Sequence, residues 1–163
     1  MNQSSRIDAQ NVSMALGAVS LSLILGALAF QYIGHIPPCE MCHWQRWPHI
    51  AAAIVGLRGG LFLRHGALPT SFDKPIAWLT ILLVATSGAL GVFHAGVEWQ
   101  WWQGPTACTG NAFHGVMDLN APIVRCDIAA WRLFGLSLAG YNALISLGLA
   151  GLGAWLLVKT KKS

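Results

Sequence analysis

Three apolar stretches constrain what this chain can fold into. Val12–Ile33, Pro75–Val97 and Leu133–Val158 run for 22, 23 and 26 residues without an Asp, Glu, Lys or Arg. A helix needs about 20 apolar residues to cross the hydrocarbon layer of a membrane. Only 10% of the 163 residues are charged, against about 25% in a typical soluble domain. The sequence therefore predicts an integral membrane protein.

A fourth apolar segment, Trp47–Leu63, is weaker because it contains Pro48 and Arg58. Arg58 lies near the end of the segment, where its guanidinium can reach the membrane surface, and Pro48 fits the first turn of a helix. A re-entrant or interfacial segment is the alternative. We expect an all-α, antiparallel four-helix transmembrane bundle that forms one domain, residues 1–163. Its helices are expected at about 12–33, 44–64, 75–97 and 133–158.

The distribution of basic residues predicts the orientation of the bundle. Seven cations fall on one side of the spans and three on the other. The seven are Arg6, Arg58, Arg64, Lys74, Lys159, Lys161 and Lys162; the three are Arg46, Arg125 and Arg132. Because cytoplasmic loops carry the excess of Lys and Arg, both termini are expected in the cytoplasm. The loops at about 34–46 and 98–132 then lie outside it.

All four cysteines lie in these two outer loops, which places them in a compartment that permits disulfides. Cys39 and Cys42 are in the first loop, and Cys108 and Cys126 are in the second. Two structural disulfides are one explanation. A four-cysteine zinc site is another, although the separation of Cys108 from Cys126 is not a zinc-knuckle spacing. The three possible pairings stay open.

The C-x-x-C pair favours exchange chemistry over a structural bond. A bond between Cys39 and Cys42 would close a very small loop and would restrain the unfolded chain little. Cys42 precedes the second predicted helix, and both the helix N-terminus and Arg46 favour a thiolate, the nucleophile of disulfide exchange. Cys108 lies in a turn-rich stretch that another protein can approach.

Cys39-x-x-Cys42-His43 also has the spacing of a c-type haem attachment site. Met117, His114 or His94 would then supply the axial ligand. A haem would leave the other two cysteines without a role, and the first loop is too short to enclose a porphyrin. Haem binding is thus the weaker hypothesis.

Two dithiol pairs on one side of a membrane suggest an electron relay from a soluble partner to a membrane acceptor. The sequence has no flavin or nucleotide fingerprint, so a quinone is the natural acceptor. Arg46 and His94 are candidates to bind its oxygens, since both offer hydrogen bonds or charge. Arg46 as a headgroup-binding cation and His94 as an interfacial polar residue are the simpler alternatives.

Other residues have structural interpretations. Asn142, Ser137 and Ser87 are expected to form interhelical hydrogen bonds, and the small residues Gly135, Ala139 and Ala143 a close packing face. The run from Phe113 to Leu119 suggests either a short helix on the membrane surface or an ordinary loop.

The ordered set of motifs resembles the disulfide bond formation protein B (DsbB) family over nearly the whole chain. The matching residues are Pro38-Cys39-x-x-Cys42-x-x-x-Arg46, a His on the third helix followed by Gly-Pro-Thr-Ala-Cys108, and Cys126-Asp127-x-x-x-Trp131-Arg132-x-x-Gly135-Leu136-Ser137. The loop between Cys108 and Cys126 is shorter than in the best-known enterobacterial-type members. The vitamin K epoxide reductase-like family shares the quinone chemistry but carries its C-x-x-C late in the chain.

The resemblance implies a protein dithiol:quinone oxidoreductase of the bacterial inner membrane, with its active loops on the periplasmic side. It would oxidise a periplasmic thioredoxin-like partner of the DsbA type and reduce ubiquinone or menaquinone. By position, Cys108 would form the mixed disulfide with the partner. Cys126 would be the disulfide mate of Cys108 and would pair transiently with Cys39. Cys42 would be the thiolate at the quinone, supported by Arg46, with His94 nearby.

Overall fold

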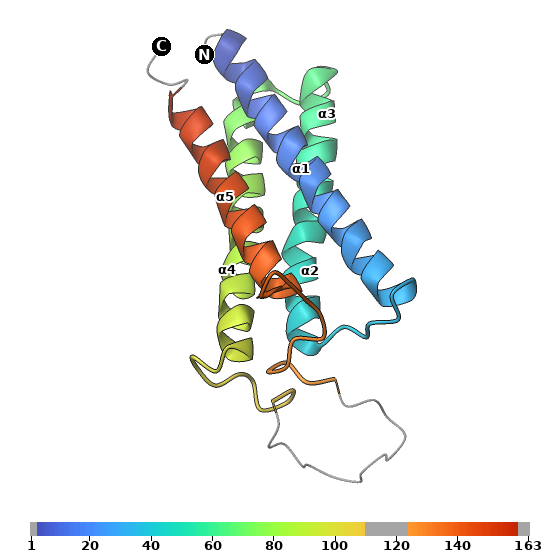
Figure 1. Cartoon of the computed structure of the whole chain (residues 1–163). Helices are drawn as coiled ribbons and strands as arrows, with labels where there is room; N and C mark the ends of the chain where they lie inside the picture. The colour runs from blue at the N-terminus through green and yellow to red at the C-terminus, as the bar shows by residue number, and fades with distance from the viewer. Residues whose placement is uncertain (1–2, 110–123, 160–163) are drawn as a thin grey trace.

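The computed structural model describes residues 3–109 and 124–159. Three long helices dominate it: α1 (Gln3–Tyr32), α4 (Asp73–Glu98) and α5 (Leu138–Lys159). A fourth helical segment is continuous but divided by a π-helical turn into α2 (Glu40–Ala53), η1 (Ile54–Arg58) and α3 (Gly59–Arg64). A short 3-10 turn, η2 (Thr70–Phe72), leads into α4. These four helical segments make up the bundle in Figure 1.

Three helices of the described part are long and apolar enough to cross a membrane. They cover Ala9–Tyr32, Thr70–Glu98 and Leu138–Lys159. At about 1.5 Å of rise per residue, the continuous segment Glu40–Arg64 is ~37 Å long, which is also enough for a crossing. The predicted number of four helices is confirmed.

The second helix begins earlier than predicted. It starts at Glu40 rather than at about residue 44, because Cys39 caps it and the prolines before Cys39 cannot continue a helix backwards. Pro48 consequently lies inside the helix, and the expectation that it occupies the first turn was wrong.

The last helix begins later than predicted, at Leu138 rather than at residue 133. The residues before it form a two-stranded antiparallel hairpin of β1 (Arg132–Leu133) and β2 (Leu136–Ser137). Its turn residues Phe134 and Gly135 have φ of 49° and 82°, as a two-residue type I′ turn requires. Ser137 accepts a hydrogen bond from the Gly140 N–H and so caps α5. Its side chain also hydrogen-bonds Glu98 of α4, as expected of an interhelical contact.

Small residues allow close helix contacts at two levels of the bundle. A Cβ on Gly91 of α4 would lie 2.9 Å from the Ala139 carbonyl oxygen and 3.0 Å from the Ala143 nitrogen. A Cβ on Gly17 of α1 would lie 2.8 Å from the backbone of η1. The close packing face is therefore confirmed at Ala139 and Ala143, whereas Gly135 belongs to the hairpin.

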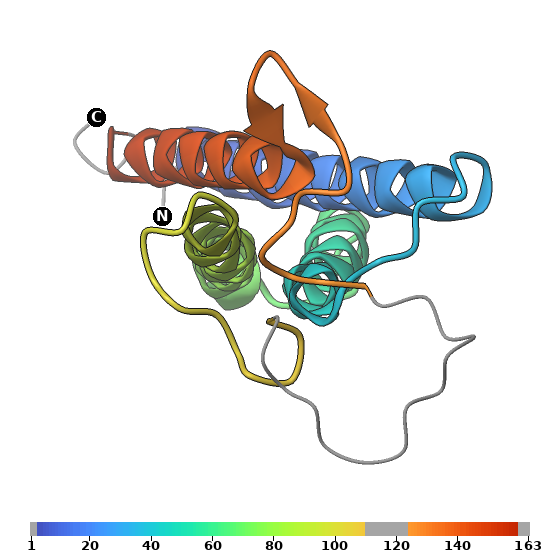
Figure 2. The same cartoon turned by 60° about the horizontal axis from the view of Figure 1, so that its bottom comes forward.

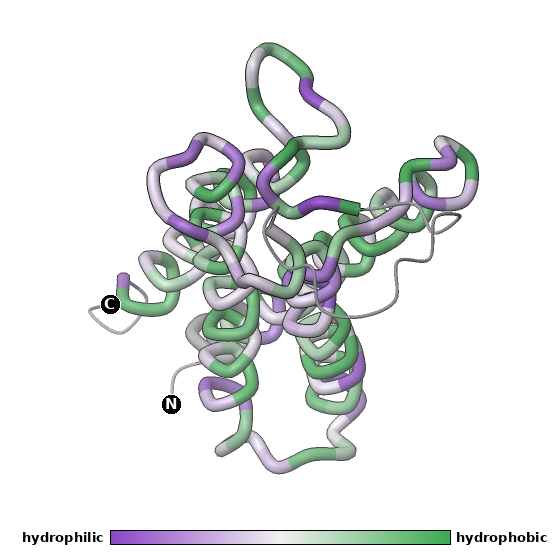
Figure 3. The backbone as a smooth tube through the Cα atoms, turned by 90° about the horizontal axis from the view of Figure 1, so that it is seen from below, coloured by the Kyte–Doolittle hydropathy of each residue, from purple (hydrophilic) through white to green (hydrophobic). Residues whose placement is uncertain are grey.

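The bundle has an apolar core and an apolar exterior. Val12, Leu16, Ile81 and Val84 are among the buried core residues. Large apolar side chains are also exposed on the long helices, including Leu25, Leu82, Leu144, Leu152 and Trp155. Figure 3 shows hydrophobic colouring along much of the helices, interrupted by hydrophilic residues, and mixed colouring in the connecting segments. This arrangement suits a lipid surrounding.

The two described ends of the chain lie together at one end of the bundle (Figure 1). The segments that carry the cysteines lie at the opposite end. Viewed from that end, α1 and α5 lie over α4 and the second helical segment, and the hairpin projects beyond them (Figure 2). We call the end of the bundle that carries the cysteine segments the loop end.

Candidate active site

Cys39 and Cys42 lie at the N-terminus of α2 and are both free thiols. Cys39 is the N-cap residue, and its Sγ accepts a hydrogen bond of 3.2 Å from the Cys42 N–H. The cap position leaves Cys39 buried and Cys42 half-buried on the first turn. The C-x-x-C spacing therefore brings both sulfurs to the same helix end.

The two thiols differ in acidity. A hydrogen bond from the Cys39 side chain lowers the pKa of Cys42, and the charge of Arg46 lowers it further, against the opposing effect of burial. The same shared hydrogen bond, followed by burial, raises the pKa of Cys39 far above its ordinary value. The pair therefore ionises first at Cys42, as the sequence predicts.

The second pair forms a disulfide between Cys108 and Cys126, with the Cα atoms 5.3 Å apart. Cys126 is fully buried and belongs to one cluster with Cys39, Met41 and Val97. Cys42 and Cys108 pack against this cluster. The fold thus brings all four cysteines, from two distant loops, into one group at the loop end.

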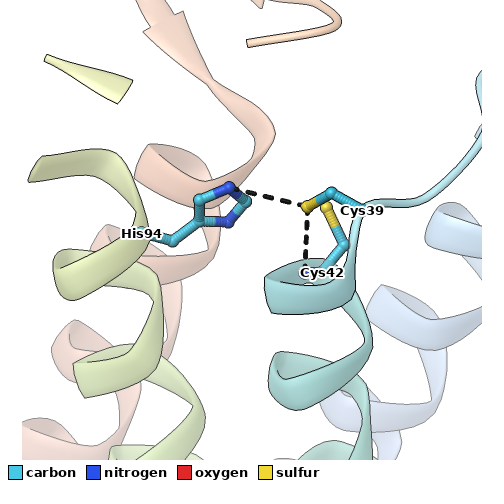
Figure 4. A group of neighbouring side chains, drawn as sticks. All are labelled: Cys39, Cys42 and His94. Carbon is cyan, nitrogen blue, oxygen red and sulfur yellow. Dashed lines mark hydrogen bonds between the residues drawn. The ribbon is translucent and has the colours of Figure 1, made fainter. Parts of the chain in front are cut away.

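His94 reaches this group from α4, as Figure 4 shows. Its Nε2 lies 3.6 Å from the Cys39 Sγ and 3.6 Å from Glu98 Oε1. Its Nδ1 lies 2.8 Å from the Gln45 side-chain nitrogen. The sequence singled out His94 as a quinone neighbour, and the structure places it beside the first cysteine of the pair.

Arg46 is held between α1 and α2. Its guanidinium donates to Gln31 Oε1 at 2.6 Å and to the Ala27 carbonyl at 3.5 Å. These bonds anchor the cation one turn of α2 below Cys42. From this position the charge of Arg46 acts on Cys42 and lowers its pKa.

Gln45, His49 and Glu98 are buried at the site but were missed in the sequence. Gln45 and His49 follow Cys42 at helical spacing, and Glu98 follows His94 by one turn. A correct start for α2 would have placed the first two on the face of Cys42. Glu98 Oε2 has no hydrogen-bond partner among the described residues.

A cavity of about 250 Å³ opens between α1, α2, α4 and α5 beside these side chains. Its polar wall includes Cys39, Cys42, Arg46, His94 and Glu98. Its other walls are apolar and include Leu23, Phe30, Leu138 and Ile145. An apolar cavity of ~150 Å³ is enough for benzene, so this one admits a substituted six-membered ring.

His43, which completes the haem-like motif, is exposed and does not line the cavity. The alternative axial residues His114 and Met117 lie outside the described residues, as does the possible surface helix from Phe113 to Leu119. Among the described residues, Cys39, Cys42 and His94 form a possible set of metal ligands. One ligand atom of each lies within 4.8 Å of the others.

The family model of disulfide bond formation protein DsbB matches residues 9–156 of the chain. The chain belongs to the DsbB family. Membership in the DsbB family indicates an oxidoreductase role in disulfide bond formation, and together with the three apolar helices it indicates an inner-membrane protein.

Relatives of the DsbB family cover most of the chain. A disulfide bond formation protein B of Dechloromonas aromatica is 29% identical over 91% of this chain and 92% of its own length. One of a Polaromonas species is 28% identical, over 88% and 89%. An uncharacterised protein of Rickettsia prowazekii is 23% identical, over 83% and 80%. No solved structure matches the chain.

Proposed function

We propose that this protein is a dithiol:quinone oxidoreductase of the bacterial inner membrane. It oxidises a periplasmic thioredoxin-like partner of the DsbA type and passes the electrons to ubiquinone or menaquinone. The observation that carries the proposal is that a single buried cluster joins both cysteine pairs. A cavity of ring size adjoins the pair on α2 and supports it.

The first half of the cycle is disulfide exchange at Cys108. The partner's thiolate attacks the Cys108 sulfur, a mixed disulfide forms, and Cys126 leaves as a thiolate. The partner's second thiol then closes the partner's own disulfide and releases Cys108 as a thiol. Cys108 is half-buried whereas Cys126 is fully buried, which supports Cys108 as the sulfur that the partner attacks.

The second half moves the electrons inward. With a disulfide between Cys39 and Cys42, the Cys126 thiolate attacks Cys39 and Cys42 leaves as a thiolate. Cys108 then closes on Cys126 and releases Cys39 as a thiol. The structure, with one bonded pair and one free pair, corresponds to the state that follows this transfer.

The residues around the cavity suit a quinone. A bound quinone supplies an acceptor for two electrons and two protons. Cys42 would present its thiolate to the ring, and Arg46 would stabilise negative charge at a ring oxygen. His94 would offer a hydrogen bond from the other side of the pair.

The distribution of cations supports an orientation with the loop end in the periplasm, where disulfides persist. A membrane-impermeant maleimide tests it. In intact cells with an opened outer membrane, a cysteine introduced at Trp101 in a Cys-free chain should be labelled, and one introduced at His65 should not. The reverse pattern would contradict the orientation.

Reaction of the purified protein with a reduced DsbA-type partner and a soluble quinone tests the activity. Quinone absorbance should fall in a cysteine-dependent way, and oxidised partner should accumulate in equal amounts. Cys42→Ser should stop quinone reduction, and Cys108→Ser should stop oxidation of the partner, while His43→Ala serves as the control. Full turnover by either cysteine variant would refute its assigned role.

The non-catalytic alternative, a scaffold with stapling disulfides, makes a different prediction. It requires cysteine bonds that stay closed under mild reduction and that exchange with no partner. Trapping a mixed disulfide between Cys108 and a partner with a single cysteine would exclude it.

A further inference from the structure

A chain of polar side chains extends from His94 into the interior of the bundle. Gln45, His49, Ser87 and Ser146 are all buried, and Asn142 of α5 joins them at the centre. His49 Nδ1 lies 3.1 Å from Ser20 Oγ at the far end. Polar groups are costly at membrane depth and usually serve a function there.

The amide of Asn142 can adopt only one orientation. Its Nδ2 lies 3.2 Å from the Ser87 backbone carbonyl and 2.8 Å from Gln45 Oε1. A backbone carbonyl can only accept a hydrogen bond, so the nitrogen of Asn142 must face it. The oxygen of Asn142 then faces His49 Nε2 at 2.9 Å and accepts from Ser146 at 2.8 Å.

The amide of Gln45 is fixed in the same way. Its Nε2 donates to the Met41 backbone carbonyl at 3.1 Å, and its Oε1 accepts from Asn142. The same Nε2 lies 2.8 Å from His94 Nδ1. Two backbone carbonyls, on Met41 and Ser87, therefore leave the Gln45 amino group pointing at His94.

We propose that Gln45 is a positioning residue that holds His94 as the tautomer with its proton on Nε2. His94 Nδ1 must accept from Gln45, so the ring proton lies on the nitrogen that faces Cys39 and Glu98, each 3.6 Å away. A second proton on Nδ1 would point at the Gln45 amino group. The ring also hydrogen-bonds the Cys126 backbone, so the His94 proton is shared between that backbone and the side of the cysteine pair, and His94 takes up no proton from the pair.

The role of this proton in a redox cycle rests on the proposed function. There, a donor at Nε2 would stabilise a cysteine sulfur or a quinone oxygen that gains negative charge. The tautomer itself does not depend on that function. It follows from hydrogen bonds within the protein.

The Gln45 amide also makes the cluster of Cys39, Cys42 and His94 poorly suited to bind a metal ion. Cys39, Cys42 and His94 resemble a three-donor zinc set. A metal-bound histidine uses the lone pair of one nitrogen and gives its other N–H to an acceptor. Here Nε2 carries the proton and Nδ1 faces a donor. Gln45→Glu would supply the acceptor and release the Nε2 lone pair.

Nitrogen NMR of the histidine rings tests the tautomer without quinone or partner. The full chain is labelled with ¹⁵N-histidine, its Cys39–Cys42 pair is kept reduced, and His94→Asn assigns the signals. The wild-type chain should show a protonated Nε2 and an unprotonated Nδ1 at His94. A protonated Nδ1 at His94 in the wild-type chain would overturn the proposal.

Cd²⁺ binding tests the consequence, followed by sulfur-to-cadmium absorbance. The background is Cys108→Ala/Cys126→Ala, so that only the α2 pair can bind. Gln45→Glu should bind Cd²⁺ at least tenfold more tightly than this background, and His94→Asn should abolish the gain. His43→Glu, which adds a carboxylate beside Cys42 on an exposed position, should change little.

An equal gain in His43→Glu, or a gain that survives His94→Asn, would mean that charge alone attracts the metal and would overturn the assignment. No gain in Gln45→Glu would do the same. Failure of quinone reduction would instead contradict the proposed function and leave both measurements intact.

Discussion

Cys39 and Cys126 lie in the same buried cluster, although they come from different loops. They are not bonded to each other, because Cys126 is bonded to Cys108 and Cys39 is a free thiol. Their mates, Cys42 and Cys108, lie at the edge of this cluster. We therefore expect Cys39 and Cys126 to be the pair that exchanges electrons between the loops.

Removing both mates should trap this exchange. In Cys42→Ser/Cys108→Ser, mild oxidation should produce a nearly complete bond between Cys39 and Cys126, identified by non-reducing peptide mapping. The matched chain Cys39→Ser/Cys108→Ser keeps Cys42 with Cys126 and should give a lower yield. Equal yields would argue against a specific inner pair.

The acidity of Cys42 should depend on Arg46. Because the pKa of Cys42 is lowered, its thiolate persists below the ordinary thiol pKa of about 8.5 and disappears only as pH falls through the lowered value. Arg46→Met removes one of the causes that lower the pKa, so the transition should move to higher pH. The ultraviolet absorbance of the thiolate, followed against pH in a chain lacking Cys108 and Cys126, measures this transition.

Arg58→Met is the control for this titration, since Arg58 is exposed and lies in the π-helical turn away from the loop end. It should leave the transition in place. A transition that moves equally in both variants would indicate a general effect of net charge.

Gly91→Ala should destabilise the bundle. The added Cβ meets the α5 backbone at 2.9 and 3.0 Å, so α4 and α5 must separate, at a cost of about 1–3 kcal/mol. Thermal unfolding in detergent measures the loss. Gly148→Ala in α5 meets nothing within 4 Å and should be neutral or slightly stabilising, as Ala is in a helix. Unchanged thermal stability in Gly91→Ala would show that α4 and α5 can separate without cost.

Asn142→Leu should destabilise the protein by about 1–3 kcal/mol, because it removes the donor to Gln45 Oε1 and the oxygen that faces His49 Nε2 and accepts from Ser146. Unfolding in detergent compared with Thr86→Val gives the measurement. Thr86 is exposed and its hydroxyl bonds the Leu82 carbonyl of its own helix, so its loss should matter little. A similar effect in the two variants would argue against a coupled network.

The sequence predicted the helices, and the placement of all four cysteines in two loops, better than the helix boundaries and the polar interior. Uncharged runs identify spans directly, because lipid excludes charge over a fixed length. The boundaries depend on local chemistry, such as the Cys39 cap and the positive φ of Phe134 and Gly135, which hydropathy does not report. These local features shifted two helix starts.

The polar interior was missed for a different reason. Gln45 and His49 come from α2, while Asn142 comes from α5, so their contact is visible only once the helices are packed. Ser87 and Asn142 were correctly expected to bond between helices. Their link to His94 depends on the orientation of one amide, which no spacing along the chain encodes.

The bond between Cys108 and Cys126 closes a covalent ring, with a separation of 18 residues between its ends. Exchange with a partner would open that ring, whose two ends are also joined by the backbone bond from the Cys126 N–H to the Cys108 carbonyl. Opening restores configurations that closure had excluded. In the proposed cycle each turnover would therefore break and remake one covalent ring, so that the entropy of closing a loop enters the energetics of exchange with the partner.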